Sequence, residues 1–235
     1  MNKTLNPPRK KIMKTIIFYD TETTWFPNWS APSEDPSQPR IISIAAELCI
    51  EETGAALGAI NFLILPDATA WKISEEIQKL TGISNELVAE FGVPMNFALN
   101  GFMELWLNAD MRCAHNESFD MRMVRIELMR HAFYAKETLL LENPPQKISY
   151  ADYWKEQPAF CTQGKSTKII GLPPSEKMVA AGRNSPKPPN LAEAYRHFTG
   201  QEIVNAHSAW ADMQACKAVY YGIKKHLADQ DAAAA

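Results

Sequence analysis

The sequence predicts one α/β domain with a mixed sheet. Strand-like segments rich in β-branched and aromatic residues come first, and strand-like and helix-like segments then alternate. The 235 residues, 46% hydrophobic and 22% charged, have the composition of a globular protein and are enough for a sizeable core. This composition excludes a wholly disordered, collagen-like or coiled-coil chain. We expect one domain at residues 12–228, a flexible basic tail at 1–11 and a frayed tail at 229–235.

Three strands open the predicted fold. Their apolar, β-branched segments are residues 14–19, 40–50 and 57–65. The short segment around Gly54 predicts a hairpin between the second and third strands. A long polar loop, residues 25–39, separates the first two strands, and such a loop inside a compact domain is commonly functional.

Helices and short strands alternate in the rest of the chain. The expected helices are residues 74–80, 95–107, 119–131, 191–198 and 209–227, and the expected strands are 111–114 and 159–161. Ser74 is a plausible N-cap of the first helix, which ends before Gly82. The spacing of the second helix offers Phe97 to the core. Residues 142–158 are expected to be irregular, and residues 164–190 are rich in Pro, Gly, Ser and Lys.

Charge and cysteine content limit the classes of function. The net charge is −3 and the pI is about 6.0, so the chain does not hold nucleic acid by bulk positive charge. The four cysteines lie far apart, which excludes a zinc ribbon and favours reduced thiols. No signal-peptide core and no bilayer-spanning apolar run are present, so we expect a cytoplasmic protein without a membrane partner.

The first candidate site is Asp20-Thr21-Glu22, at the end of the first apolar segment. Residues i and i+2 of an extended chain point to the same face, so the two carboxylates leave the strand together. At about 4 Å and an effective dielectric of about 20, two such charges repel by roughly 4 kcal/mol. Solvent or a bound cation makes that pair tolerable. The alternative is a solvated loop.

The second candidate site is His115-Asn116-Glu117-Ser118-Phe119-Asp120, between a short apolar strand and an amphipathic helix. Asp120 falls in the first helical turn, where the helix dipole favours a carboxylate. The alternative interpretation is ordinary helix capping by Ser118 or Asp120.

The third candidate site pairs His207 with Asp212, five residues later. Ser208 can cap the helix that begins there, which places Asp212 just inside it among apolar residues. A buried carboxylate without a partner is unfavourable. We therefore expect Asp212 to meet a cation.

These three segments, in this order, resemble the motifs of the DEDDh family of 3′→5′ exonucleases, which includes proofreading subunits, RNase T and oligoribonuclease. The His207-x4-Asp212 spacing is the form that separates this group from its tyrosine-containing sister group. The resemblance extends over most of residues 14–225 and is greatest to short phage or bacterial members. Trp25 stands where the family often has glycine, and Thr81 where many members have histidine.

The resemblance implies an RNase H-like fold, with a mixed five-stranded sheet whose first three strands are antiparallel, flanked by helices. It implies that Asp20, Glu22, Asp120 and Asp212 bind two Mg²⁺ or Mn²⁺ ions and, with His207 as general base, are the catalytic residues. Oxygen ligands suit these hard cations, and the unperturbed pKa of histidine, about 6.5, suits a base at neutral pH. The implied reaction is two-metal-ion hydrolysis that releases nucleoside 5′-monophosphates from single-stranded 3′ ends.

The resemblance also indicates which groups bind the substrate. The residues expected to hold the last nucleotide are Thr21, Thr23, Ile73, Asn116 and Phe119. We favour DNA over RNA as the substrate. The alternatives are a 3′→5′ exoribonuclease or oligoribonuclease and, in a different class, a non-catalytic nucleic-acid-binding module that serves a polymerase. Association with a DNA polymerase and homodimerisation are compatible with the resemblance, as several relatives dimerise.

Three further features have weaker interpretations. Gly164-Lys165-Ser166-Thr167 looks like the end of a P-loop, but Ala159 occupies the position of the first glycine, so NTP hydrolysis is not expected. The basic segment from Lys165 to Lys187 is either a solvated loop or a surface that follows a phosphate backbone. Trp25, Phe26 and Trp29 either stack on bases or pin their loop to the core, and we favour pinning.

Overall fold

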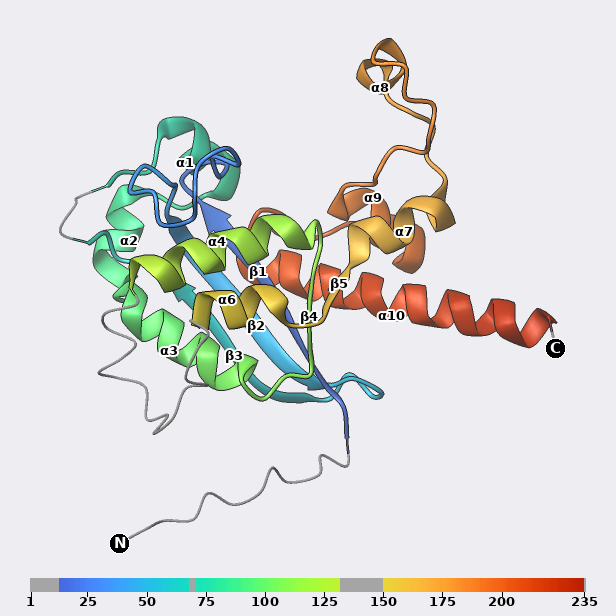
Figure 1. Cartoon of the computed structure of the whole chain (residues 1–235), viewed down its shortest axis with the longest axis horizontal. Helices are drawn as coiled ribbons and strands as arrows, with labels where there is room; N and C mark the ends of the chain where they lie inside the picture. Colours follow the sequence, from blue (N-terminus) through green and yellow to red (C-terminus); the bar gives the residue numbers. More distant parts are fainter. Residues whose placement is uncertain (1–12, 68–70, 132–149, 235) are drawn as a thin grey trace, which may run out of the picture.

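The computed structural model describes residues 13–67, 71–131 and 150–234. The predicted basic tail, residues 1–11, and residues 142–149 of the segment predicted to be irregular lie outside these ranges. A five-stranded sheet with the order β3-β2-β1-β4-β5 forms the centre of the molecule (Figure 1). The strands are β1 (Thr15–Thr23), β2 (Ile41–Ile50), β3 (Ala56–Leu63), β4 (Met111–Ala114) and β5 (Ala159–Cys161).

The strand directions confirm the predicted topology. β1 pairs with β2, and β2 with β3, in antiparallel register. β4 is parallel to β1, and β5 is parallel to β4. This is the mixed sheet, flanked by helices, of the expected RNase H-like fold.

Helices cover both faces of the sheet (Figure 1). They are α1 (Glu75–Thr81), α2 (Asn85–Phe91), α3 (Met95–Trp106), α4 (Glu117–Arg130), α6 (Tyr150–Glu156), α7 (Thr162–Ile170), α8 (Glu176–Ala180), α9 (Leu191–Thr199) and α10 (Ala209–Ala234). None of these helices combines the length and the apolar character that crossing a bilayer requires.

Alternate side chains of β1 enter two separate cores. Ile17 and Tyr19 pack with residues of α3, α4 and α6, including Trp154. Ile16 and Phe18 pack on the opposite face against α10, including Tyr220. Burial on both faces explains why the apolar part of β1 is continuous rather than alternating. All four cysteines are free, and three of them are buried.

Some elements differ from the sequence predictions. β1 continues to Thr23, so the first acidic pair lies on the strand itself rather than after it. α2, α7 and α8 were not predicted, and α6 forms in a segment expected to be irregular. Trp154 of α6 is fully buried, so tertiary packing supplies a stability that the local sequence does not reveal.

Two further predictions are wrong. α10 does not end near residue 227 but extends to Ala234, through residues expected to form a frayed tail. Phe97 of α3 is 56% exposed and contacts Phe62 of β3 at the surface instead of entering the core.

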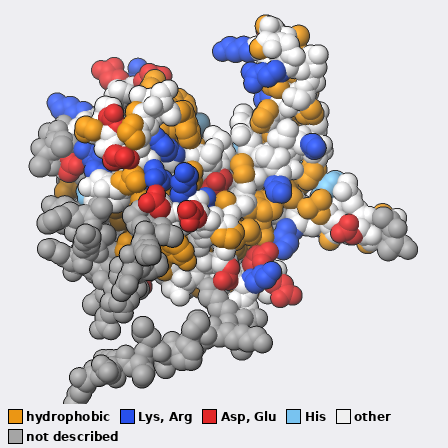
Figure 2. Space-filling view, in the orientation of Figure 1, with side chains coloured by type: hydrophobic (Ala, Val, Ile, Leu, Met, Phe, Trp, Pro, Cys, Tyr) orange, Lys and Arg blue, Asp and Glu red, His pale blue; other side chains and the backbone are white. Residues whose placement is uncertain are grey.

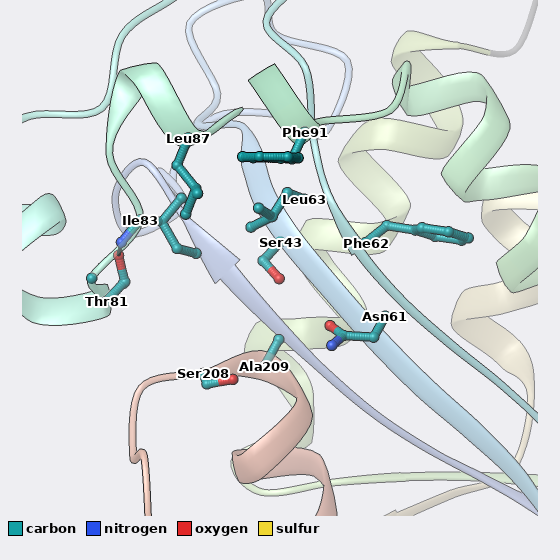
Figure 3. A pocket seen from close by; sticks show the side chains of 11 residues that line it. Ser43, Asn61, Phe62, Leu63, Thr81, Ile83, Leu87, Phe91, Ser208 and Ala209 are labelled. Carbon is teal, nitrogen blue, oxygen red and sulfur yellow. Dashed lines mark hydrogen bonds between the residues drawn. The ribbon is translucent and has the colours of Figure 1, made fainter. Parts of the chain in front are cut away.

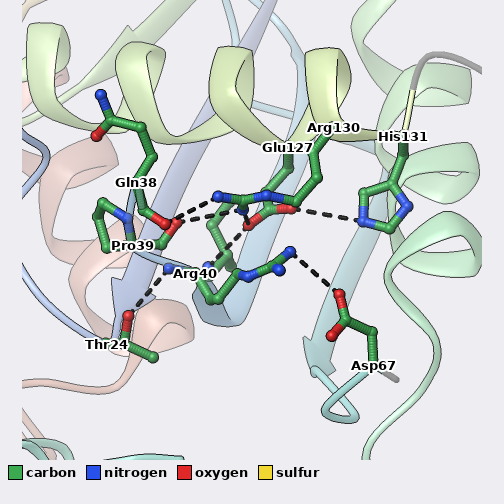
Figure 4. Close-up of polar contacts among 9 residues, drawn as sticks. Thr24, Gln38, Pro39, Arg40, Asp67, Glu127, Arg130 and His131 are labelled. Atoms are coloured by element: carbon green, nitrogen blue, oxygen red, sulfur yellow. Dashed lines mark hydrogen bonds and ion pairs between the residues drawn. The ribbon is translucent and has the colours of Figure 1, made fainter. Parts of the chain in front are cut away.

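A buried ion pair of α4 anchors the long loop between β1 and β2 (Figure 4). Arg130 of α4 pairs with Glu127 and donates to the backbone oxygens of Gln38, at 2.8 Å, and Pro39, at 3.3 Å. Glu127 is 1% exposed, so this charged pair is shielded from solvent. Buried polar groups need partners, and the loop backbone supplies them here.

The aromatic residues of this loop do not pin it to the core. Trp25, Phe26 and Trp29 are 50%, 68% and 57% exposed, which contradicts the pinning interpretation. Phe26 contacts Phe119 at the start of α4, with the ring centroids 6.0 Å apart. Because Arg130 and Glu127 anchor the loop, its aromatic side chains remain available at the surface.

Candidate active site

Two elements bring three carboxylates together at the end of β1. Asp20 and Glu22 project from the face of β1 that α10 covers, since they alternate with Thr21 in the same register as Phe18. Asp212 lies in the first turn of α10. One carboxylate oxygen from each of the three residues lies within 4.8 Å of the other two. The first and third predicted motifs therefore meet.

Asp120 of α4 is the fourth predicted acid, and its carboxylate is bound to Thr21 of β1. Its Oδ1 accepts hydrogen bonds from the backbone N–H of Thr21, at 3.0 Å, and from Thr21 Oγ1, at 2.7 Å. It is not one of the three residues whose oxygens converge, although its charge helps to raise the pKa of both Asp20 and Glu22. The capping interpretation of Asp120 is wrong, because α4 begins at Glu117 and this carboxylate binds β1.

Burial disfavours the ionised forms of all four acids, and the charges of neighbouring acids add to this effect for Asp20 and Glu22. Burial, followed by the charges of Asp212 and Asp120, raises the pKa of Glu22 to about 8. Burial raises the pKa of Asp120 to about 7, and burial and the neighbouring acids raise the pKa of Asp20 well above its usual value. Burial also raises the pKa of Asp212. Such perturbed groups gathered in one place are typical of functional sites.

The donor set fits a divalent cation. Asp212 Oδ2 accepts a hydrogen bond from the backbone N–H of His207, at 3.1 Å. Its Oδ1 is buried and has no hydrogen-bond partner among the described residues. A buried oxygen without a partner, beside two more carboxylates, is the arrangement that a hard cation would satisfy.

His207 lies next to the acids in an unusual backbone conformation. Its φ is +66°, in the left-handed region, and its N–H is bound to Asp212. The residue is exposed. The backbone therefore fixes the position of His207 relative to Asp212, while the imidazole remains accessible to a molecule at the carboxylates.

The other predicted site residues have varied surroundings. Thr21 is buried and bound to Asp120, and the Thr23 hydroxyl donates to the backbone oxygen of Trp25 at 2.9 Å. Asn116 is exposed at the N-cap of α4 with a φ of +61° and makes no side-chain capping bond. Phe119 is half-buried against Phe26.

Ile73 lies in an apolar cluster rather than at the surface. It is 2% exposed and packs beneath α1 and α2 with Ile42, Ile77, Ile83 and Val88. Its backbone is bound to the side chain of Asn85. Ile73 is therefore a core residue of this region of the fold.

A cavity of about 450 Å³ lies beside the carboxylates. Its lining includes Ser43, the register partner of Glu22 on β2, and Ser208, whose backbone oxygen accepts from Asp212 N–H. Figure 3 shows Ser43, Asn61 and Ser208 along one side of the cavity, opposite the apolar Leu87 and Phe91. None of the lining residues is charged.

Sequence reasoning missed most of this cavity. The resemblance places Thr81 near the expected terminal nucleotide, and Ser43 and Ile83 fall in segments that resemble the family. Asn61 and Phe91 belong to no recognisable motif. The period-2 pattern of β2 could have placed Ser43 on the face of Glu22 once the strand register was known.

Comparisons with known proteins agree with this geometry. The family model RNase_T, described as an exonuclease, matches residues 17–220. No curated protein matches the chain. Similar solved structures are E. coli exonuclease I with a dT13 oligonucleotide (18% identity, TM-score 0.62, covering 92% of this chain and 43% of that one) and the zinc-bound form of an E. coli exonuclease I–ssDNA complex (19%, 0.61, 91% and 41%).

Exonuclease I from Methylocaldum szegediense is also similar, at 19% identity and a TM-score of 0.57, with coverage of 90% of this chain and 40% of that one. The chain thus spans about two-fifths of the length of these exonuclease I structures. At this identity the similarity shows a shared fold. The family match covers most of the chain, including all three acidic motifs, and the chain belongs to this exonuclease family.

Proposed function

We propose that this protein is a metal-dependent 3′→5′ exonuclease of the DEDDh type that acts on single-stranded DNA. The observation that carries the proposal is the convergence of Asp20, Glu22 and Asp212 beside an exposed histidine and an uncharged cavity. The family match supports nuclease chemistry. The oligonucleotide complexes of E. coli exonuclease I support a single-stranded DNA substrate.

Asp20, Glu22 and Asp212 would hold divalent ions, with Asp120 as the fourth acid. Two Mg²⁺ or Mn²⁺ ions would stabilise the charge on the attacking and leaving oxygens of the phosphodiester. Two hydrogen bonds from Thr21 of β1 fix Oδ1 of the Asp120 carboxylate beside the strand that carries Asp20 and Glu22. The raised pKa values of the acids are consistent with a site completed by positive charge.

His207 would act as the general base. A ring nitrogen accepts a proton from the attacking water as the new P–O bond forms and the bond from phosphorus to the 3′ oxygen of the preceding nucleotide breaks. The products are a nucleoside 5′-monophosphate and a strand shortened by one nucleotide with a new 3′ hydroxyl. The fixed His207 backbone positions this step relative to Asp212.

The cavity beside Glu22 would take the terminal nucleoside. Its apolar wall suits a base, and the hydroxyl and amide groups of Ser43, Asn61 and Ser208 suit the polar edges of a base or sugar. The scissile phosphate would then lie at the carboxylates. Thr23, Asn116 and Phe119 are proposed to contact the same nucleotide from the side of α4, where Phe26 extends the aromatic surface.

The test is degradation of 5′-labelled single-stranded DNA with Mg²⁺, beside matched RNA and duplex DNA. We expect a ladder that shortens from the 3′ end, is absent with EDTA, and is faster with DNA than with RNA. Asp20→Asn should abolish the ladder, and His207→Gln should lower kcat by about 10²- to 10⁴-fold. Asp229→Asn, an exposed acid on α10, is the matched control and should retain full activity.

Other outcomes would favour the alternatives. Faster cleavage of RNA would indicate an exoribonuclease or oligoribonuclease. Binding of single strands that persists in Asp20→Asn, without turnover by the wild type in Mg²⁺ or Mn²⁺, would indicate a non-catalytic binding module. Association with a DNA polymerase and formation of a homodimer stay predictions, to be measured by co-purification and sedimentation.

A further inference from the structure

The segment between α7 and α9 forms an arm that stands away from the rest of the molecule. It comprises residues 171–190 and includes α8, and we call it the α8 arm. In Figure 1 it rises above α7 and α9, at the upper right of the view. Figure 2 shows the arm separated from the body by a hollow, with Lys and Arg side chains on its inner side.

The α8 arm is ordered without a hydrophobic core. α8 has no buried residue, and the Ser175 side chain caps it by accepting from Met178 N–H at 3.3 Å. The backbone N–H of Lys187 donates to Leu172 O at 3.1 Å and joins the two sides of the stem. Five prolines stiffen that stem, at positions 173, 174, 186, 188 and 189. Because α8 in the arm buries no side chain, the arm contributes little to the hydrophobic core, which favours a role at the surface.

Positive charge is concentrated in the arm and the helix that precedes it. Residues 162–190 contain five Lys or Arg and one Glu, in a chain with a net charge of −3. Lys187 pairs with Glu193 at 2.6 Å. Lys168, Lys177 and Arg183 are exposed, and none of them pairs with an acid in the part of the chain that the structure describes.

The base of the arm is fastened to the segment that carries Asp120. Pro189 O accepts from Gln163 Nε2 at 3.1 Å and lies 3.1 Å from His115 Nε2. His115 Nδ1 lies 2.9 Å from Thr162 Oγ1 at the start of α7. Burial lowers the pKa of His115 to about 4, so its ring is neutral and donates through Nε2 at physiological pH. The arm is therefore anchored between the second acidic motif and α7.

We propose that the α8 arm, through Lys177 and Arg183, and the adjoining end of α7, through Lys168, bind the phosphodiester backbone of the same strand whose 3′ end lies at the carboxylates. This inference rests on the proposed function. The carboxylates repel the phosphates of a nucleic-acid strand. Positive charge at a distance from the cleaved bond would offset this repulsion, and the arm carries exposed cations. Phosphate contacts carry no sequence information. The arm should therefore strengthen the binding of longer strands without favouring any base.

The test compares two triple variants with the same change of charge. The first, Lys168→Gln, Lys177→Gln and Arg183→Gln, removes the three cations. The second, Lys79→Gln, Lys155→Gln and Lys225→Gln, removes three exposed cations on other helices. Binding of a fluorescent 20-nucleotide strand is measured in EDTA over a range of salt. Neutralising three phosphate contacts should reduce the slope of log K against log salt by about 2, since each single-strand contact contributes about 0.7.

Turnover distinguishes failure of this inference from failure of the proposed function. With Mg²⁺, the arm variant should raise KM for the 20-nucleotide strand at least tenfold and leave cleavage of a dinucleotide unchanged, because a dinucleotide ends close to the carboxylates. The control variant should change neither value. An unchanged salt slope and KM in the arm variant would overturn the inference, whatever the turnover. Equal loss of binding to DNA and to polyglutamate would overturn it as well, by indicating a general anion-binding surface. Absence of dinucleotide cleavage by the wild type would contradict the proposed function alone.

Discussion

Glu22 links the protonation of the acidic group to the stability of the fold. Its pKa rises from a usual value of 4.5 to about 8, mainly because it is buried near other acids. Between these pH values the folded protein holds a proton that the unfolded chain releases. The free energy of unfolding of the metal-free protein therefore falls as the pH rises from about 5 to 8.

The first prediction is that Mg²⁺ stabilises the protein more at higher pH. A cation favours the ionised carboxylates, so it offsets a repulsion that grows as they lose protons. We expect 10 mM Mg²⁺ to raise Tm by about 3 °C or more at pH 8, the size of a change near 1 kcal/mol in a protein of this length. The rise should be small at pH 5.5. Differential scanning fluorimetry at both pH values measures it, and equal rises would contradict the coupling.

Asp212→Asn gives the second prediction. The amide removes one negative charge from the group while retaining the size of the side chain and an oxygen that can accept from His207 N–H. The metal-free variant should therefore melt about 2–6 °C above the wild type at pH 8, because relief of like-charge repulsion stabilises by about 1–2 kcal/mol. The same variant should lose the Mg²⁺-dependent rise. Lower stability than the wild type, with the Mg²⁺ response intact, would show that Asp212 has an ordinary structural role.

Asn61 gives the third prediction. Its side chain lies at the edge of the cavity beside the carboxylates (Figure 3). Asn61→Trp should partly fill that cavity and raise KM for DNA about tenfold or more, a loss near 1.4 kcal/mol of binding. The affinity for Mn²⁺ should not change, because the carboxylates are untouched. Asn61→Gln, which changes the volume little, is the matched control. Unaltered KM in the tryptophan variant would place the nucleoside elsewhere.

Packing between α9 and α10 depends on one glycine. A Cβ built at Gly222 of α10 would lie 2.6 Å from Cβ and 2.7 Å from Cγ of Phe198 in α9. A Cβ at Gly164 of α7 meets nothing closer than 3.8 Å. The close approach of the two helices therefore requires glycine at position 222 and does not require it at 164.

The fourth prediction follows from this difference. Gly222→Ala should lower the free energy of unfolding by about 1–2 kcal/mol, because the strain of overpacking exceeds the gain in helix propensity. Gly164→Ala should raise it by up to about 0.5–1 kcal/mol through helix propensity alone. Urea denaturation of both variants measures the two changes. A gain in stability for both would mean that α9 shifts freely away from α10.

The elements that the sequence did not reveal are short helices, and one of them depends on the burial of an aromatic side chain. The strand patterns and the capping residues Ser74 and Gly82 predicted their elements closely, because those signals are local. α6 is stabilised by the burial of Trp154 against Tyr19 and Phe102, which are far away in sequence. Tertiary contacts of this kind override a weak local pattern.

The acidic site was predictable because its chemistry needs particular side chains at particular places. The strand pattern and the helix start placed Asp20, Glu22 and Asp212 but also allowed a solvated loop. The resemblance to the exonuclease motifs singled out these residues, whose oxygens converge. The cavity was not predictable, since Ser43 and Asn61 are ordinary strand residues until the register places them beside Glu22. The exposure of Trp25 and Phe26 also depended on distant anchors, Glu127 and Arg130.

The molecule as a whole combines an acidic centre, an uncharged cavity and a basic arm. The chain matches about two-fifths of the length of the exonuclease I structures. Net negative charge elsewhere is compatible with binding a strand at one local surface. Recognition then depends on where the charges lie rather than on how many there are.

The most direct test is to count Mn²⁺ ions bound to the wild type, to Asp20→Asn and to the control Asp229→Asn by electron paramagnetic resonance, with mononucleotide release from single-stranded DNA measured on the same samples. We predict two bound ions and turnover in the wild type and in the control. Asp20→Asn should lose at least one ion and all turnover while keeping its fold. Unchanged Mn²⁺ binding and turnover in Asp20→Asn would contradict the assignment of these carboxylates as the metal centre.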